Sequence, residues 1–132
     1  MPDDKKMPDA VSSSAKTRDQ YESYPYPARD PQDEDKRLIT GSPGNWDEVV
    51  HFVFGGRDPS AKGKIRILVA GGGTGDALVM LAQQARDRKA KAEIVYIDLS
   101  ESARAIAEAR IKHRNLEKNV TFVTGSFVDL AA

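Results

Sequence analysis

Three short apolar runs rich in β-branched residues lie in the second half of the chain, at Ile65–Ala70, Glu93–Asp98 and Val120–Thr124. Runs of this length and composition are typical of buried strands. Between them, from Gly75 to about Arg88 and from about Glu101 to Arg114, apolar residues recur at helical spacing. The pattern predicts an α/β fold whose three parallel strands stand in the order 3-2-1, because both crossovers should be right-handed. This arrangement is the mononucleotide-binding half of a doubly wound sheet.

Upstream of the first predicted strand, the pattern of apolar positions predicts less regular structure. Residues 1–20 are polar and charged and cannot bury enough apolar surface to offset their ordering entropy, so a disordered N-terminal tail is predicted. Residues 21–63 are expected to form an N-terminal arm and a short helix, which runs from about Trp46 to Phe54 behind an Asn45 cap. Residues 64–132 contain the predicted α/β domain.

The first part of this region, Tyr21–Pro31, contains three tyrosines and three prolines and is called the arm below. Tyrosine is a large amphipathic side chain that favours lying on a surface. Two interpretations stay open: a linker packed loosely on the domain, or an arm that covers a ligand pocket. The charge run Asp30–Arg37 is predicted to be a solvated stretch. His51, inside the apolar short helix, is interpreted as a partly buried packing residue rather than a catalyst.

The first predicted strand stops abruptly at the glycine loop, GGGTGDA, residues 71–77. Glycine permits positive φ and lets a ligand approach the backbone. The helix N-terminus behind the loop offers unpaired N–H groups and a partial positive charge, a device that holds nucleotide-like ligands. The alternative is a plain strand–helix turn. The dinucleotide fingerprint needs glycine at its sixth position, which is Asp76 here, and the Gly-Lys-Ser/Thr ending of a P-loop is absent.

Asp98 ends the second predicted strand, about 20 residues beyond the glycine loop. The second strand should lie beside the first, so the carboxylate should lie next to the loop and could accept hydrogen bonds from both hydroxyls of a ribose. The alternative is an ordinary strand-ending acid that caps the following helix. A ribose role argues against a ligand with a 2′-phosphate, because two negative charges would then face each other.

The Gly-x-Gly-x-Gly spacing from Gly71, the acid Asp98 and the turn Gly125–Phe127 resemble class I S-adenosylmethionine-dependent methyltransferases, over roughly Ile65–Leu130. The resemblance implies a Rossmann-like sheet and S-adenosyl-L-methionine as cofactor, with the glycine loop at its amino-acid end and the turn beside its adenine. The cofactor-binding residues that it implies are Gly71, Gly72, Gly73, Thr74, Gly75, Asp76, Asp98, Leu99, Ser126 and Phe127.

Two positions depart from that family's pattern. Val69 stands where the family often has an acid that helps to hold the cofactor's ammonium group, and Asp76 is a candidate to supply that charge instead. Ser126 stands where the family commonly has an acid that accepts from the adenine amino group. Adenine recognition is therefore expected to rely on the backbone and on Leu99 and Phe127 as apolar walls.

The resemblance implies methyl transfer to an acceptor that the sequence does not identify, and it names no catalytic residue. A complete domain of that family has more strands than the three predicted here, so the chain is expected to be its cofactor-binding N-terminal part, truncated after the third strand and inactive alone. Two other functions stay open: a half-domain of a dinucleotide-dependent oxidoreductase, and a non-catalytic nucleotide- or cofactor-binding fragment whose partner supplies further strands.

The composition of the chain limits which kinds of partner and metal site can be expected. The chain has 132 residues, a formal net charge of +0 and no cysteine. Zero net charge predicts no bulk attraction to nucleic acid or to an anionic membrane, and the absence of thiols excludes a disulfide framework and thiolate metal ligands. No apolar run is long enough to span a bilayer, and the charged N-terminus is unlike a signal peptide. A cytoplasmic protein without a metal is expected; the sequence leaves its oligomeric state open.

Overall fold

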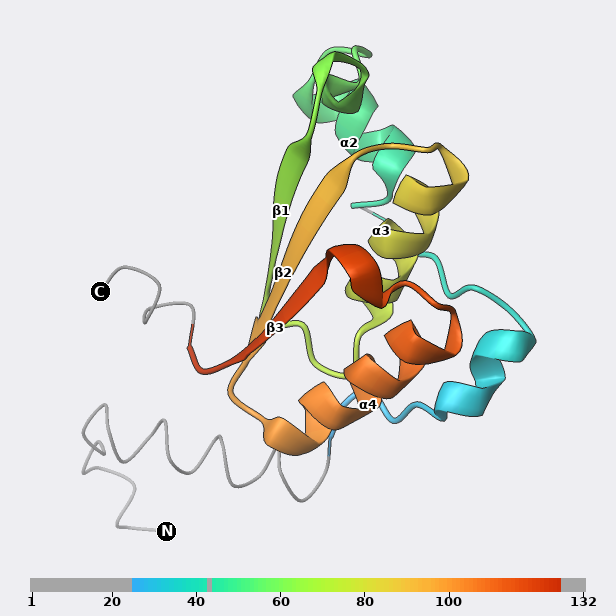
Figure 1. The fold of residues 1–132 in the computed structure, drawn as a ribbon, viewed down its shortest axis with the longest axis vertical. Coiled ribbons are helices and arrows are strands. Elements are labelled where there is room, and N and C mark those ends of the chain that lie inside the picture. The colour runs from blue at the N-terminus through green and yellow to red at the C-terminus, as the bar shows by residue number, and fades with distance from the viewer. Residues whose placement is uncertain (1–24, 43, 127–132) are drawn as a thin grey trace, which may run out of the picture.

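A parallel sheet of three strands forms the centre of the protein, whose computed structural model describes residues 25–42 and 44–126 (Figure 1). The strands are β1 (Ile65–Ala70), β2 (Ala92–Asp98) and β3 (Val120–Thr124). Strand β2 lies between the other two, which confirms the predicted order. Leu68 lies beside Val95 in the first pairing. The carboxyl ends of all three strands therefore meet at one edge of the sheet.

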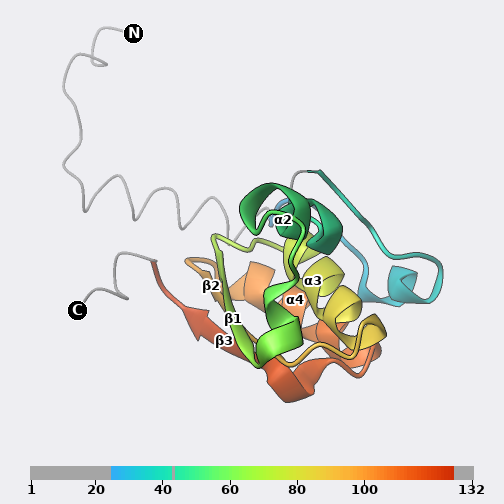
Figure 2. The same ribbon diagram turned by 90° about the horizontal axis from the view of Figure 1, so that it is seen from above.

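Two long helices cover one face of this sheet, as Figures 1 and 2 both show. They are α3 (Asp76–Asp87) and α4 (Glu101–His113), each within two residues of its predicted ends. Ser100 caps the N-terminus of α4 as predicted, because its side chain accepts a hydrogen bond from the Ala103 N–H. The core lies between helices and sheet and is formed by Val69, Leu78, Val79, Ala82, Ile94, Tyr96, Ala107, Ile111 and Leu116.

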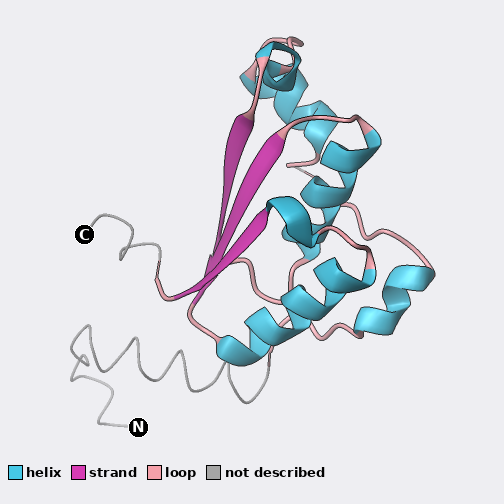
Figure 3. Ribbon diagram, in the orientation of Figure 1, coloured by secondary structure: helices cyan, strands magenta, loops and turns pink. Residues whose placement is uncertain are grey.

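The short helix α2 (Trp46–Val53) packs at the amino ends of the strands, opposite the edge at which the strands end (Figure 3). Asn45 caps it as predicted, accepting from the Glu48 N–H at 3.0 Å. Trp46 is buried against the end of α3, where its backbone N–H donates to Gln84. The prediction for His51 is wrong: its side chain is exposed and touches the ring of Phe52.

The charge run Asp30–Arg37 is largely exposed, as its composition predicts, with one exception. It contains the 3₁₀ helix η2 (Pro31–Asp35), whose Glu34 is buried against α4. Two other 3₁₀ helices, η3 (Pro59–Lys62) and η4 (Glu117–Asn119), lead into β1 and β3. The predicted tail, with Tyr21 and Tyr24 of the arm and Phe127 of the last turn, lies outside the described residues.

Candidate functional site

The predicted site residues converge at the edge where the strands end. The N–H groups of Gly71 and Gly72 both donate to the carbonyl of Ile97, at 2.8 and 3.2 Å, which ties the glycine loop to the end of β2. The N–H of Gly125 donates to the carbonyl of Asp98 at 2.7 Å, which brings the turn after β3 to the same place. Segments that are far apart in the sequence therefore form one continuous backbone surface.

Asp98 lies directly against the glycine loop. Its Oδ2 accepts from the Gly73 N–H at 2.8 Å and its Oδ1 from the Ser100 N–H at 2.9 Å, and the residue is 7% exposed. The bond to the Ser100 N–H closes a turn just before α4, but Ser100 itself caps that helix, so the alternative interpretation of Asp98 as the cap is wrong. The carboxylate also holds the loop, which neither interpretation included. Each carboxylate oxygen has a second lone pair, so the geometry leaves room for the ribose role, which stays a prediction.

Three of the loop glycines are required by the protein's own packing. A Cβ on Gly72 would lie 2.5 Å from the ring of Tyr96, and a Cβ on Gly75 would lie 3.0 Å from the Cβ of Ala107. Gly73 has a φ of +56°, and a Cβ there would lie 2.9 Å from the carbonyl oxygen of Tyr26. A side chain at any of these positions would displace part of the core or the arm.

Gly71 differs from the other loop glycines. It also has a positive φ, of +66°, but a Cβ built on it meets no heavy atom within 4 Å. Its surroundings are therefore open, whereas Gly73 is buried beneath the arm. The open part of the glycine loop is the part through which a ligand can approach the backbone most closely.

Tyr96 is a site residue that the sequence reasoning missed. It is completely buried in β2, and its hydroxyl donates to the carbonyl of Gly73. Burial raises the pKa of this hydroxyl well above its usual value, with the nearby Asp98 charge acting in the same direction. Tyr96 therefore stays protonated and acts as a permanent donor that fixes the shape of the loop.

The described part of the arm lies on the glycine loop, although Tyr26, its one described tyrosine, is 73% exposed and does not hold it there. That the arm covers a ligand pocket stays a prediction. Thr74 donates through its hydroxyl to the carbonyl of Pro27. Arg29 binds the Asp76 carboxylate with two hydrogen bonds, from Nε at 2.8 Å and from Nη2 at 2.7 Å. These bonds hold the pKa of Asp76 below its ordinary value. The charge that was a candidate for a ligand ammonium is thus paired within the protein.

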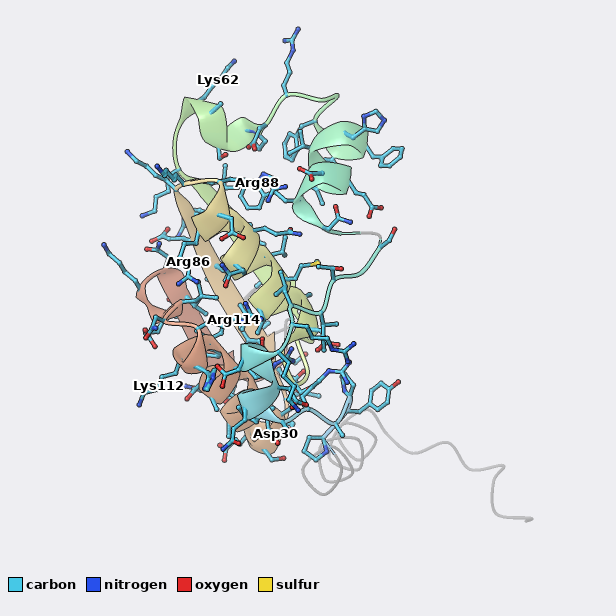
Figure 4. All side chains as sticks on the ribbon, turned by 90° about the vertical axis from the view of Figure 1, so that its right-hand side faces the viewer. Asp30, Lys62, Arg86, Arg88, Lys112 and Arg114 are labelled. Carbon is cyan, nitrogen blue, oxygen red and sulfur yellow. The ribbon has the colours of Figure 1, made fainter. Side chains whose placement is uncertain are left out.

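A buried arginine on α4 completes this connection. Arg110 is 0% exposed; its Nε donates to Glu34 of η2 at 2.8 Å, and its Nη1 donates to the Thr74 carbonyl at 3.0 Å and to Asp76 at 2.8 Å. Arg114 binds the other oxygen of Glu34 and, in Figure 4, lies between η2 and the two long helices. The sequence reasoning missed both arginines, although Arg110 is three residues after the inward-facing Ala107 and so shares its face.

The remaining predicted residues stand at the borders of this surface. Leu99 and Ser126 are partly buried, and Phe127 lies outside the described residues. Within residues 25–42 and 44–126, no group of three histidine, cysteine or acidic residues is placed to hold a metal ion. No helix in the same ranges is long and apolar enough to cross a membrane.

An apolar groove of about 580 Å³ lies elsewhere, between α2 and the first residues of β1. Its walls include Trp46, Phe54 and Leu68, and none of the predicted site residues contributes to them. The size of this groove therefore says nothing about the glycine loop, which lies at the other end of the sheet.

Comparison with protein families identifies the same part of the chain. Residues 67–132, half of the chain, match the family model described as a methyltransferase domain. The match begins within β1 and includes the glycine loop, Asp98 and the turn after β3. A search of curated proteins finds none that matches.

Proposed function

The chain belongs to the methyltransferase-domain family, and from that premise we propose that it binds S-adenosylmethionine at the glycine loop for transfer of the cofactor's methyl group. The bound cofactor would supply an electrophilic methyl sulfonium. The described residues would bind and orient it, since methyl transfer depends mainly on alignment of the two reacting atoms. The acceptor and the residues that contact it are left unassigned.

The observation that carries the proposal is the hydrogen bond from the Gly73 N–H to Asp98. It puts an ionisable acceptor and the glycine loop in direct contact at the carboxyl edge of the sheet, which is where doubly wound folds bind nucleotides. In a nucleoside ligand that lies across this edge, the ribose would face Asp98 and the adenine would reach Leu99 and the turn at Ser126. The amino-acid end would extend over Gly71.

The residues present suit such a ligand in two further respects. The open space at Gly71 lets a ligand approach the backbone. The fully buried Arg110 would not contact the ligand, but its Nη1 donates to the Thr74 carbonyl at 3.0 Å and so fixes the shape of the loop that receives it.

Calorimetric titration with S-adenosylhomocysteine and with its analogue lacking both ribose hydroxyls tests the proposal. Wild-type protein should prefer the hydroxylated ligand by about 1.5–3 kcal/mol, the scale of hydrogen bonds to a charged group. Asp98→Asn should lose most of this preference, because the amide can accept only through its carbonyl oxygen. The preference of one ligand over the other is little affected by general damage to the fold.

Asp47→Asn is the matched control, since it removes an acid on α2, at the opposite end of the sheet. It should leave both affinities unchanged. Equal affinity of wild-type protein for the two ligands would remove the ribose role of Asp98. Tighter binding of NAD than of S-adenosylhomocysteine would overturn the cofactor assignment and favour the oxidoreductase alternative.

A further inference from the structure

We propose that Arg29 is a positioning residue of the cofactor site, which acts through Asp76 to hold the arm as one wall beside the glycine loop. The inference rests on the proposed function, because the wall matters only if the loop receives a ligand. Its new content is that affinity for the amino-acid end of the ligand depends on an ion pair between the arm and α3.

The arm contacts the glycine loop at several residues. The carbonyl of Tyr26 lies over Gly73, 2.9 Å from where a Cβ would stand, and the carbonyl of Pro27 accepts from the Thr74 hydroxyl. Two residues after Pro27, Arg29 forms an ion pair with Asp76, with 2.7 Å between Nη2 and Oδ2. Residues 26–29 of the arm therefore run along the glycine loop and cover Gly73, while the space at Gly71 stays open beside them.

Burial divides the charged network into an inner and an outer part. The side chains of Arg110 and Glu34 are 0% and 3% exposed, so this inner pair is part of the core. The side chains of Arg29 and Asp76 are 30% and 31% exposed, and this outer pair borders solvent. Removing the outer pair should loosen the arm on the loop, which the Thr74–Pro27 hydrogen bond still joins, without unfolding the domain, because the inner pair still fastens η2 to α4.

The charges around the loop balance. Three arginines, Arg29, Arg110 and Arg114, bind the carboxylates of Asp76 and Glu34, and the Asp98 carboxylate lies against Gly73. Arg110 is fully buried, so a ligand would not contact it. The place of the ligand's amino-acid end over Gly71 is therefore set by the wall that Arg29 holds rather than by an excess of charge.

The test compares two ligands on the full chain carrying Arg29→Gln. S-adenosylhomocysteine has the amino-acid end, and 5′-methylthioadenosine has the same nucleoside without it. The variant should bind S-adenosylhomocysteine about three- to tenfold more weakly, the effect of one partly exposed bidentate pair, and should bind 5′-methylthioadenosine unchanged. In a double-mutant cycle, Asp76→Asn and Arg29→Gln should weaken binding less than additively, because both break the Arg29–Asp76 contact and only Asp76→Asn also breaks the contact with Arg110.

Arg88→Gln is the matched control. It breaks an ion pair with Asp47 of the same 2.7 Å length at the other end of α3. Figure 4 shows Arg88 at the opposite end of the protein from Asp30, the neighbour of Arg29 in the chain. This variant should leave both affinities unchanged.

Each other outcome has a distinct meaning. Unchanged binding of both ligands by Arg29→Gln would overturn the inference and leave the proposed function intact. Equal weakening of both ligands would also overturn it, because the arginine would then support the whole domain rather than one wall. Binding of neither ligand by folded wild-type protein would instead overturn the proposed function, and with it the premise of this inference.

Discussion

Replacing Arg110 with methionine should destabilise the protein severely. The side chain is fully buried and donates hydrogen bonds to Glu34, Thr74 and Asp76. Removing one partner of a buried ion pair costs about 3–5 kcal/mol. In the variant, Glu34 still binds Arg114 and Asp76 still binds Arg29. We therefore expect a loss of stability at the lower end of this range, about 3 kcal/mol. That is a large share of the roughly 5–15 kcal/mol by which a typical domain is stable.

Urea denaturation followed by the fluorescence of Trp46, the only tryptophan in the chain, measures this loss. The double variant Arg110→Met/Glu34→Leu serves as the control for an unpaired charge. It should be less destabilised than the sum of its single variants, because apolar replacement of both partners leaves no buried carboxylate behind. A free energy of unfolding for Arg110→Met within about 0.5 kcal/mol of wild type would refute the assigned network.

Two further predictions concern the glycine loop and its charge. Gly72→Ala should cost about 1–3 kcal/mol through overpacking against the ring of Tyr96, whereas Gly41→Ala, with open space around it, should be neutral in the same urea assay. Acid should weaken the protein through Asp76, whose pKa is lowered on folding chiefly by the hydrogen bonds from Arg29. The stabilisation is present above the ordinary carboxyl pKa of 3.8 and is lost as the pH falls through the lower pKa of the folded state. Asp76→Asn should therefore lose less stability than wild type between pH 5 and pH 2, and equal losses in urea titrations at these pH values would contradict the ion pair.

The local pattern was sufficient to predict the strands and helices of the domain. Strand β1 has the predicted bounds, because a β-branched run that ends at consecutive glycines has one clear beginning and one clear end. Strand β2 begins one residue earlier than predicted, at Ala92, where an alanine between Lys91 and Glu93 gave no signal. The strand order followed from the handedness of the crossovers, which depends on no particular side chain.

Long-range pairing of charges could not be predicted in the same way. Glu34 and Arg110 are separated by 76 positions, and neither stands out in its own segment: one lies in a charge run and the other in a helix rich in arginine. Only the assembled fold places them together out of water. Tyr96 is a similar case, since its place in an apolar strand was clear but its hydrogen bond to Gly73 depends on the loop's path.

The central claim is that the glycine loop and Asp98 form a site for S-adenosylmethionine or its demethylated product. Titration of folded wild-type protein with S-adenosylhomocysteine, and separately with NAD, in a calorimeter tests it most directly. We predict saturable binding of S-adenosylhomocysteine and much weaker binding of NAD. Absence of any heat of binding with S-adenosylhomocysteine, from a sample whose Trp46 fluorescence shows a cooperative urea transition, would contradict the claim.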